Sequence, residues 1–238
     1  MNIPLHKKIE QDILKKIKSG EYPENETIPT EIELSEAYGV SRPTIRQAVQ
    51  SLVNEGYLEK RKKRGTLVKR PKFQQEFTRY VESFDSEFYR KGMSSRTTVL
   101  NFTETTATME VAQNLGINKD DPVYKLTRLR FAEDKPLVFV TSFIPCQILP
   151  DLKQVDFSEH SLYKTFKEMG HPIHSVSRKL EIAMADETAS YLLDIKENDP
   201  LFYFHTQGFT ENRIPIEYSI AKYRGDINSF VLEISKPS

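Results

Sequence analysis

The sequence predicts an α+β protein with two domains, a small and mainly helical one at the N-terminus and a larger one built on antiparallel strands. Apolar residues recur at helical spacing in the first 53 residues, whereas six later segments alternate in the manner of strands. The 238 residues are enough for two such domains. We place the N-terminal domain at 1–70, a linker at 71–76 and the C-terminal domain at 77–238.

Three helices are expected in the N-terminal domain. Residues 5–19 carry apolar side chains at helical spacing and are followed by Gly20. The pattern of Thr30 with Glu33 predicts a capping box, in which the Thr30 side chain starts a short helix that runs to about Tyr38. Ser41 is expected to cap a third helix with one apolar face. That face holds Ile45, Ala48, Val49, Leu52 and Val53.

Two short strands, 57–60 and 66–69, are expected after these helices, joined by the basic turn 61–65. This order of elements is typical of a winged helix-turn-helix, which places one helix in the major groove of DNA. Residues 38–72 contain 10 basic and 2 acidic residues, although the whole chain has 34 of each. A confined basic block favours contact with a polyanion, while a solvated charged face is the alternative.

The expected C-terminal domain alternates strands with short helices. Strands are predicted at 99–105, 123–131, 137–144, 176–183, 201–209 and 214–223, and helices at 109–115, 162–169 and 187–193. Residues 109–145 and 187–223 repeat one pattern of helix, Asp-Pro, strand, turn and strand, with the two Asp-Pro pairs 78 residues apart. Two copies of one unit predict a pseudo-symmetric antiparallel sheet with a cavity between the copies.

The polar face of the third helix carries side chains suited to reading DNA. Arginine matches the two acceptors of guanine, and glutamine can pair with adenine. Hydroxyls at helix N-termini and a cationic hairpin suit the phosphate backbone or the minor groove. The candidate DNA-binding residues are Thr30, Ser41, Arg42, Thr44, Arg46, Gln47, Lys63, Arg64 and Gly65.

These segments resemble the DNA-binding domain of the GntR family. The matching stretches are 28–31, 41–48, 55–58 and 64–66, within a similarity that covers about residues 5–70. The resemblance implies a homodimeric regulator, usually a repressor, on a palindromic DNA operator, with DNA contacts at the candidates other than Lys63 and Arg64. The wing tip, Lys62 to Gly65, departs from the family's usual sequence but keeps its positive charge.

Two arginines in the predicted strand 123–131 suggest an anion site. Arg128 and Arg130 point to one face, roughly 7 Å apart, and would hold a carboxylate or phosphate between them. Two solvated arginines are the alternative. Glu217 and Tyr223 share a face of the strand 214–223, together with small residues that suit a cavity wall. Residues 92–96 could form an anion-binding turn.

The C-terminal segments resemble the HutC-type effector domain of GntR regulators, the UTRA domain, which has a chorismate-lyase-like fold. The similarity covers about residues 77–236, and members that sense phosphorylated sugars use the paired arginines for the phosphate. Val140 stands where sugar-binding relatives often have a glutamate. The effector-binding residues implied are Ser94, Ser95, Arg128, Arg130, Ser161, Tyr163, Glu217 and Tyr223.

The expected function is therefore repression of carbohydrate uptake or catabolism genes, relieved by a small anionic metabolite such as a sugar phosphate. A fatty acid or an amino-acid-related ligand is an alternative effector, and a lyase-type enzyme with an accessory nucleic-acid module is the alternative function. We expect no catalytic residue, cofactor or metal, since the sequence has no GxGxxG, P-loop, HExxH or CxxC motif. Neither a signal peptide nor a membrane span is expected, so the expected location is cytoplasmic.

Overall fold

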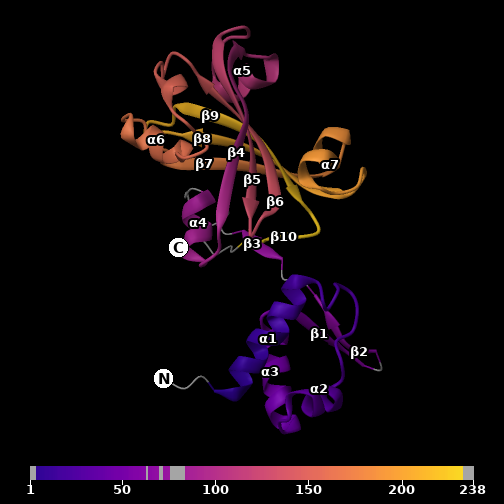
Figure 1. The fold of residues 1–238 in the computed structure, drawn as a ribbon. Coiled ribbons are helices and arrows are strands. Elements are labelled where there is room, and N and C mark those ends of the chain that lie inside the picture. The colour runs from indigo at the N-terminus through magenta and orange to yellow at the C-terminus, as the bar shows by residue number, and fades with distance from the viewer. Residues whose placement is uncertain (1–3, 63, 70–71, 76–83, 233–238) are drawn as a thin grey trace, which may run out of the picture. The chain divides into compact units, whose positions relative to one another are not determined.

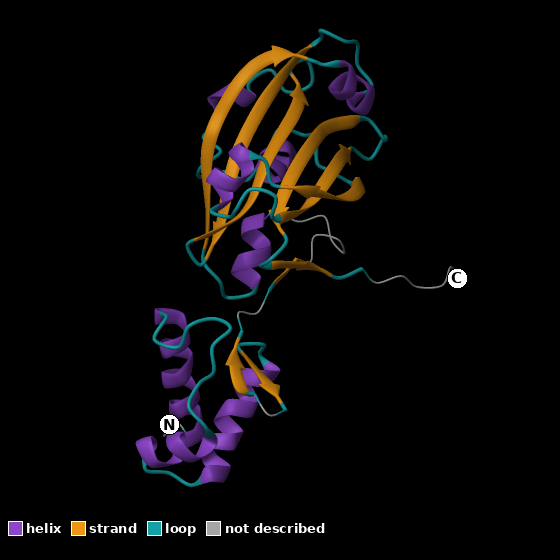
Figure 2. Ribbon diagram, turned by 90° about the vertical axis from the view of Figure 1, so that its right-hand side faces the viewer, coloured by secondary structure: helices purple, strands orange, loops and turns teal. Residues whose placement is uncertain are grey.

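The computed structural model describes residues 4–62, 64–69, 72–75 and 84–232. The chain divides into two compact units, residues 1–72 and 73–238. Figures 1 and 2 show a mainly helical N-terminal unit and a C-terminal unit dominated by one large sheet. The α+β class and the order of the two units are as predicted. None of the described helices is long and apolar enough to cross a bilayer.

The N-terminal unit has the predicted helix, helix, helix, hairpin order. Its elements are α1 (Leu5–Ser19), α2 (Glu31–Tyr38), α3 (Arg42–Asn54), β1 (Leu58–Arg61) and β2 (Gly65–Val68). The two strands pair antiparallel, and the apolar stripe of α3 packs into a core with residues of α1, α2 and both strands. The helix-turn-helix with a hairpin wing is therefore present as expected.

The helix starts in this unit follow from the capping residues. Thr30 forms the predicted capping box with Glu33, and Gly39 ends α2 with a φ of 62°. Ser41 occupies the N-cap of α3, as predicted, but its hydroxyl does not cap the helix. It lies 2.9 Å from the Thr44 hydroxyl instead, so both hydroxyls stand together at the start of α3.

The C-terminal unit is built on a six-stranded antiparallel sheet in the order β4-β5-β6-β9-β8-β7. Its strands are β4 (Ser95–Thr106), β5 (Pro122–Ala132), β6 (Lys135–Pro145), β7 (Ser175–Met184), β8 (Pro200–Phe209) and β9 (Pro215–Arg224). All six predicted strands are present. One face packs against α5 (Met109–Leu115) and α7 (Glu187–Leu193), and the other against α4 (Phe84–Arg90) and α6 (Leu162–Glu168).

The structure contains the predicted internal repeat. Each half runs strand, helix, hairpin, and the two halves meet where β6 pairs with β9 at the middle of the sheet. The turns match as well: Asn118 N donates to the Asp121 carboxylate over 2.8 Å, and Lys196 N donates to the Asp199 carboxylate over 2.9 Å. The Asp-Pro pairs therefore mark equivalent turns in the two halves.

The predicted linker needs a correction. Residues 73–75 form strand β3 (Phe73–Gln75), which pairs parallel with β10 (Asn228–Phe230). Gln75 is fully buried, and its amide donates to the Asn228 side chain over 2.7 Å. The polar sequence of this segment gives no sign of that partner, because Asn228 lies more than 150 residues away. Helix α4, with seven residues, was not predicted either.

Candidate functional site

The exposed polar face of α3 is held in place by a carboxylate on α2. Arg46 Nε donates to one oxygen of Glu31 over 3.1 Å, and Lys60 Nζ from β1 donates to the other oxygen, also over 3.1 Å. Although partial burial opposes the shift, these two cations lower the pKa of Glu31. The three side chains thus join α2, α3 and the wing. The exposed ion pair of Arg46 is a weak one that a stronger anion can replace.

The other DNA-binding candidates are spread over the same unit. Thr30, Ser41 and Thr44 lie at the starts of α2 and α3, and Gln47 lies one residue beyond Arg46 on an exposed position. Arg64 and Gly65 lie in the wing, where Gly65 has a φ of 86° that favours glycine. Lys63 falls outside the described residues. The local structure of this unit thus leaves the polar face of α3 and the wing residues Lys62, Arg64 and Gly65 exposed.

A cavity lies on the sheet face covered by α4 and α6, and both halves of the repeat line it. Arg128, Arg130 and Val140 come from the first half, and Glu217, Ala221 and Tyr223 come from the second. The cavity between the two copies is therefore as predicted. The remaining lining residues are Phe84, Asp85, Glu87, Thr97, Phe157, His160, Ser161, Leu162, Tyr163, Arg178, Phe204, Thr206 and Ser219.

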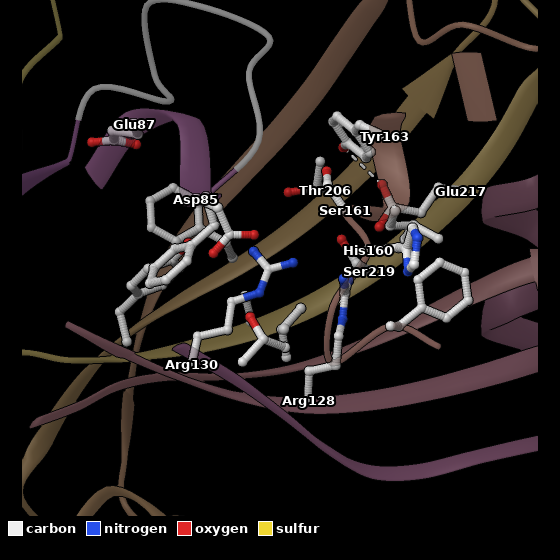
Figure 3. Close-up of a pocket in the computed structure, with 18 of the residues that line it drawn as sticks. Asp85, Glu87, Arg128, Arg130, His160, Ser161, Tyr163, Thr206, Glu217 and Ser219 are labelled. Carbon is white, nitrogen blue, oxygen red and sulfur yellow. Dashed lines mark hydrogen bonds between the residues drawn. The ribbon is translucent and has the colours of Figure 1, made fainter. Parts of the chain in front are cut away.

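A hydrogen-bonded chain of four side chains organises one end of the cavity. Glu217 is only 3% exposed; it accepts from the Ser142 hydroxyl over 2.8 Å and from the Tyr163 hydroxyl over 2.7 Å. Arg128 donates to the same Ser142 hydroxyl over 3.3 Å. Burial, and after it the negative charge of Glu217, raises the pKa of Tyr163, so its phenol remains a donor. Figure 3 shows the hydrogen bond between Tyr163 and Glu217.

The two predicted arginines place positive charge in the cavity, where Arg128 is buried and Arg130 is half-buried. Burial, together with the charge of Arg130, lowers the pKa of Arg128 to about 9, with Glu217 opposing the shift. Nε of both Arg128 and Arg130 is buried and has no hydrogen-bond partner among the described residues. Figure 3 shows both guanidinium groups directed into the cavity, with Asp85 on the Arg130 side. Unsatisfied buried cationic donors are costly, so this site favours an anion.

Apolar side chains line the cavity beside the arginines. Val140 pairs in register with Ala221, and Ala221 with Phe204, so the three form a row across β6, β9 and β8. Phe84 from α4 lies 5.1 Å below the Arg130 guanidinium. Burial raises the pKa of Tyr223 to about 12, so this residue too offers a neutral phenol. The cavity therefore combines cationic and hydrogen-bonding groups with apolar side chains.

Comparisons with known proteins place both units in described families. Residues 5–68 match the model "Bacterial regulatory proteins, gntR family", and residues 90–227 match the model "UTRA domain". The chain belongs to the GntR family and carries a UTRA domain. The predicted family is thereby confirmed.

Full-length relatives support the assignment to GntR. The transcriptional repressor NagR of Bacillus subtilis is 31% identical over 96% of this chain and 94% of its own length. The mannosyl-D-glycerate transport/metabolism system repressor MngR of Escherichia coli is 29% identical over 99% of this chain and 98% of its own. The crystal structure of PhnF from Mycobacterium smegmatis matches with a TM-score of 0.78 at 25% identity, covering 98% of this chain and 100% of that one.

These proteins and the families are DNA-binding transcription regulators and not enzymes. This GntR chain is therefore a transcription regulator, and the alternative of a lyase-type enzyme is dropped.

The UTRA cavity gathers most of the predicted effector residues but not all. Arg128, Arg130, Ser161, Tyr163, Glu217 and Tyr223 line it together. Ser95 lines a neighbouring hollow, where its hydroxyl donates to Asp85 over 3.0 Å. Ser94 lines neither, because its amide donates to Glu133 over 3.0 Å and its hydroxyl lies 3.4 Å from the same oxygen. A carboxylate of the chain itself thus occupies the predicted anion-binding turn.

Several cavity residues were missed from the sequence. Asp85 and Glu87 come from the unpredicted helix α4, and Arg178 comes from the edge strand β7. Thr206 could have been found, since it pairs in register with Ser219, on the face already assigned to the cavity. Arg178 pairs with Thr206 in turn, so the alternation of β7 also pointed to this face.

Proposed function

We propose that this regulator is a repressor that binds a palindromic operator as a homodimer and is released by a small anionic metabolite of the sugar phosphate class. The observation that carries the effector class is the pair Arg128 and Arg130, two guanidiniums in one cavity whose Nε atoms are buried without a hydrogen-bond partner among the described residues. One relative, MngR, is a repressor whose name refers to mannosyl-D-glycerate transport and metabolism, which agrees with this class. The controlled genes would be those of carbohydrate uptake or catabolism.

The proposed ligand pose follows from the charged, hydroxyl and apolar side chains that line the cavity. The phosphate would lie between the two guanidiniums, with the hydroxyl of Ser161 near it, and sugar hydroxyls would meet Glu217, Tyr163 and Tyr223. Val140 and Ala221 offer no hydrogen bond, so the sugar would present an apolar patch to that wall. DNA would be contacted by the residues at the starts of α2 and α3, by Arg46 and Gln47 on α3, and by the wing, with bases read mainly from α3.

A thermal-shift screen against phosphorylated sugars, their unphosphorylated parents, amino acids and fatty acids tests the proposal. A ligand that binds only the native protein at 100 times its Kd should stabilise it by about 2.7 kcal/mol. We expect the largest shift with one sugar phosphate, and we expect that compound to release operator DNA in a fluorescence anisotropy titration. A shift confined to fatty acids or amino acids would overturn the effector class but leave DNA binding intact.

A path of contacts connects the cavity with strand β3, which follows the boundary between the units. Helix α4 lines the cavity with Phe84, Asp85 and Glu87. Lys91, just after α4, binds Glu87 over 2.6 Å and donates to the carbonyl of Gln74 in β3. A ligand that moves α4 would therefore move β3, and with it the chain that leads to the DNA-binding unit.

Replacing Gln75 with leucine is expected to weaken this coupling without weakening effector binding. The change removes the 2.7 Å hydrogen bond to Asn228 that holds β3 against β10, while leucine keeps the site filled. Couplings of this kind are worth about 1–3 kcal/mol, and we expect most of that to be lost. The coupling free energy is measured from the operator affinity with and without effector. The matched control is Gln74→Leu, which changes an exposed neighbour. Equal coupling in both variants would contradict the path.

A further inference from the structure

A third arginine lines the cavity from the edge strand β7. Arg178 is half-buried, and it stands far along the sheet from Arg128 and Arg130, which belong to β5. Strands β5 and β7 are four positions apart in the sheet, which corresponds to about 19 Å between their backbones. The phosphate position between Arg128 and Arg130 gives Arg178 no part in binding, so its place in the cavity needs another explanation.

Arg178 belongs to a polar row that crosses the cavity face of the sheet. It pairs in register with Thr206 on β8, and Thr206 pairs with Ser219 on β9. Thr206 and Ser219 both line the cavity and are 6% and 7% exposed (Figure 3). Neither hydroxyl makes a hydrogen bond with another described residue. A guanidinium and two available hydroxyl donors therefore stand side by side.

The neighbouring row of the same face is apolar and ends at the other cationic group. It runs from Phe204 through Ala221 and Val140 to Arg128. The polar row begins on β7 and the apolar row ends on β5, so the two positive charges mark opposite ends of the cavity face. Apolar side chains lie beside the space between them.

The two phenols of the cavity respond to both cationic groups. Burial raises the pKa of Tyr163 and of Tyr223, and at both phenols the positive charges of Arg130 and Arg178 oppose this rise. Tyr163 and Tyr223 therefore lie within electrostatic reach of both ends of the cavity face. A ligand that contacts these phenols is close enough to place one anionic group at each end.

We propose that Arg178, Thr206 and Ser219 form a second anion subsite, which binds a carboxylate of the effector, so that the effector is a phosphorylated sugar acid. This inference rests on the proposed function and narrows its ligand class. A single guanidinium offers two parallel donors and one positive charge, which matches a carboxylate. A phosphate carries close to two negative charges at neutral pH and matches the arginine pair on β5 better.

The chain's own carboxylate on β9 is committed elsewhere. Glu217 stands two residues before Ser219, on the same face of the strand. It accepts its hydrogen bonds from Ser142 and Tyr163, so these bonds do not involve the subsite.

Compounds that differ only at C6 of the sugar test the subsite. They are glucose 1-phosphate, glucuronic acid 1-phosphate and glucose 1,6-bisphosphate, together with their galactose counterparts. In isothermal titration of the full-length protein, we expect a uronic acid phosphate to bind about tenfold or more tightly than its parent sugar phosphate, because it gains a hydrogen bond between charged groups. Arg178→Met should abolish this preference and leave the Kd of the parent unchanged.

Two variants separate this subsite from its surroundings. Lys179→Met removes a positive charge from the opposite face of β7 and should keep the preference, as the matched control. Arg128→Met should weaken the binding of every phosphorylated compound, whether or not it carries a carboxylate.

Three results would overturn the subsite while leaving the proposed function standing. These are equal binding of parent and uronic acid by the wild type, tighter binding of the bisphosphate than of the uronic acid, and a preference that survives in Arg178→Met. Failure of all these compounds to bind would also overturn the inference, and the thermal-shift screen would show separately whether the sugar phosphate class fails as well.

Discussion

Replacing Arg128 with methionine should abolish the response to a sugar phosphate while leaving the fold and operator binding intact. The side chain is 3% exposed and carries one of two unsatisfied guanidinium donors in the cavity. Losing one partner of a buried charge pair costs about 2–5 kcal/mol, which corresponds to a Kd roughly 30-fold or more higher. Isothermal titration with the sugar phosphate measures this loss, and the thermal midpoint without ligand reports the fold.

The matched control for Arg128 lies on the same strand. Lys125→Met removes the same charge from the opposite face of β5, away from the cavity, and should leave the affinity unchanged. The unphosphorylated sugar provides a second comparison, because its weaker binding should be the same in wild type and in Arg128→Met. A variant that still prefers the phosphorylated ligand as strongly as wild type would refute the assignment of Arg128 to the phosphate.

Replacing Arg46 with alanine should weaken operator binding by about 1–3 kcal/mol and should also relax the preference for one base pair. The Arg46 side chain lies on the exposed face of α3. Its ion pair with Glu31 is also exposed, so replacing that ion pair with a hydrogen bond to a base costs little free energy. Fluorescence anisotropy on the operator, and on operators changed at single positions in each half-site, measures both effects.

The wing supplies the contrast to Arg46. Arg64→Ala should weaken binding to all sequences about equally and lower the slope of log affinity against log salt by about 1, because a phosphate contact carries no sequence information. If Arg46→Ala and Arg64→Ala changed affinity and selectivity in the same way, the division between base reading on α3 and backbone contact at the wing would be wrong.

Local patterns predicted the elements of this protein well. The capping box of Thr30 and Glu33, the apolar stripe of α3 and the strand alternation each depend on residues within a few positions of one another, and all three are present. The internal repeat predicted a cavity between two halves, because two copies of a strand, helix and hairpin unit complete one sheet together. Six of the eight predicted effector residues line that cavity.

Other features arise from contacts between distant residues. The burial of Gln75 against Asn228 turned an expected linker into a strand, and Glu133 took the turn predicted for an anion at Ser94. Helix α4 brings Asp85 and Glu87 into the cavity, and no local sequence pattern predicted this contribution. These errors share one cause, since a polar residue gives no sign of which distant partner will satisfy it.

The sequence by itself determined the two-unit organisation, the family, and the placing of Arg128 and Arg130 on one face, because spacing along a helix or strand fixes which side chains share a side. Only the tertiary structure decided that the Nε atoms of both arginines are buried without partners and that Glu217 is held by Ser142 and Tyr163. It also decided which strands are edges. Burial, register and charge environment depend on how separate elements pack, and packing is a property of the whole chain.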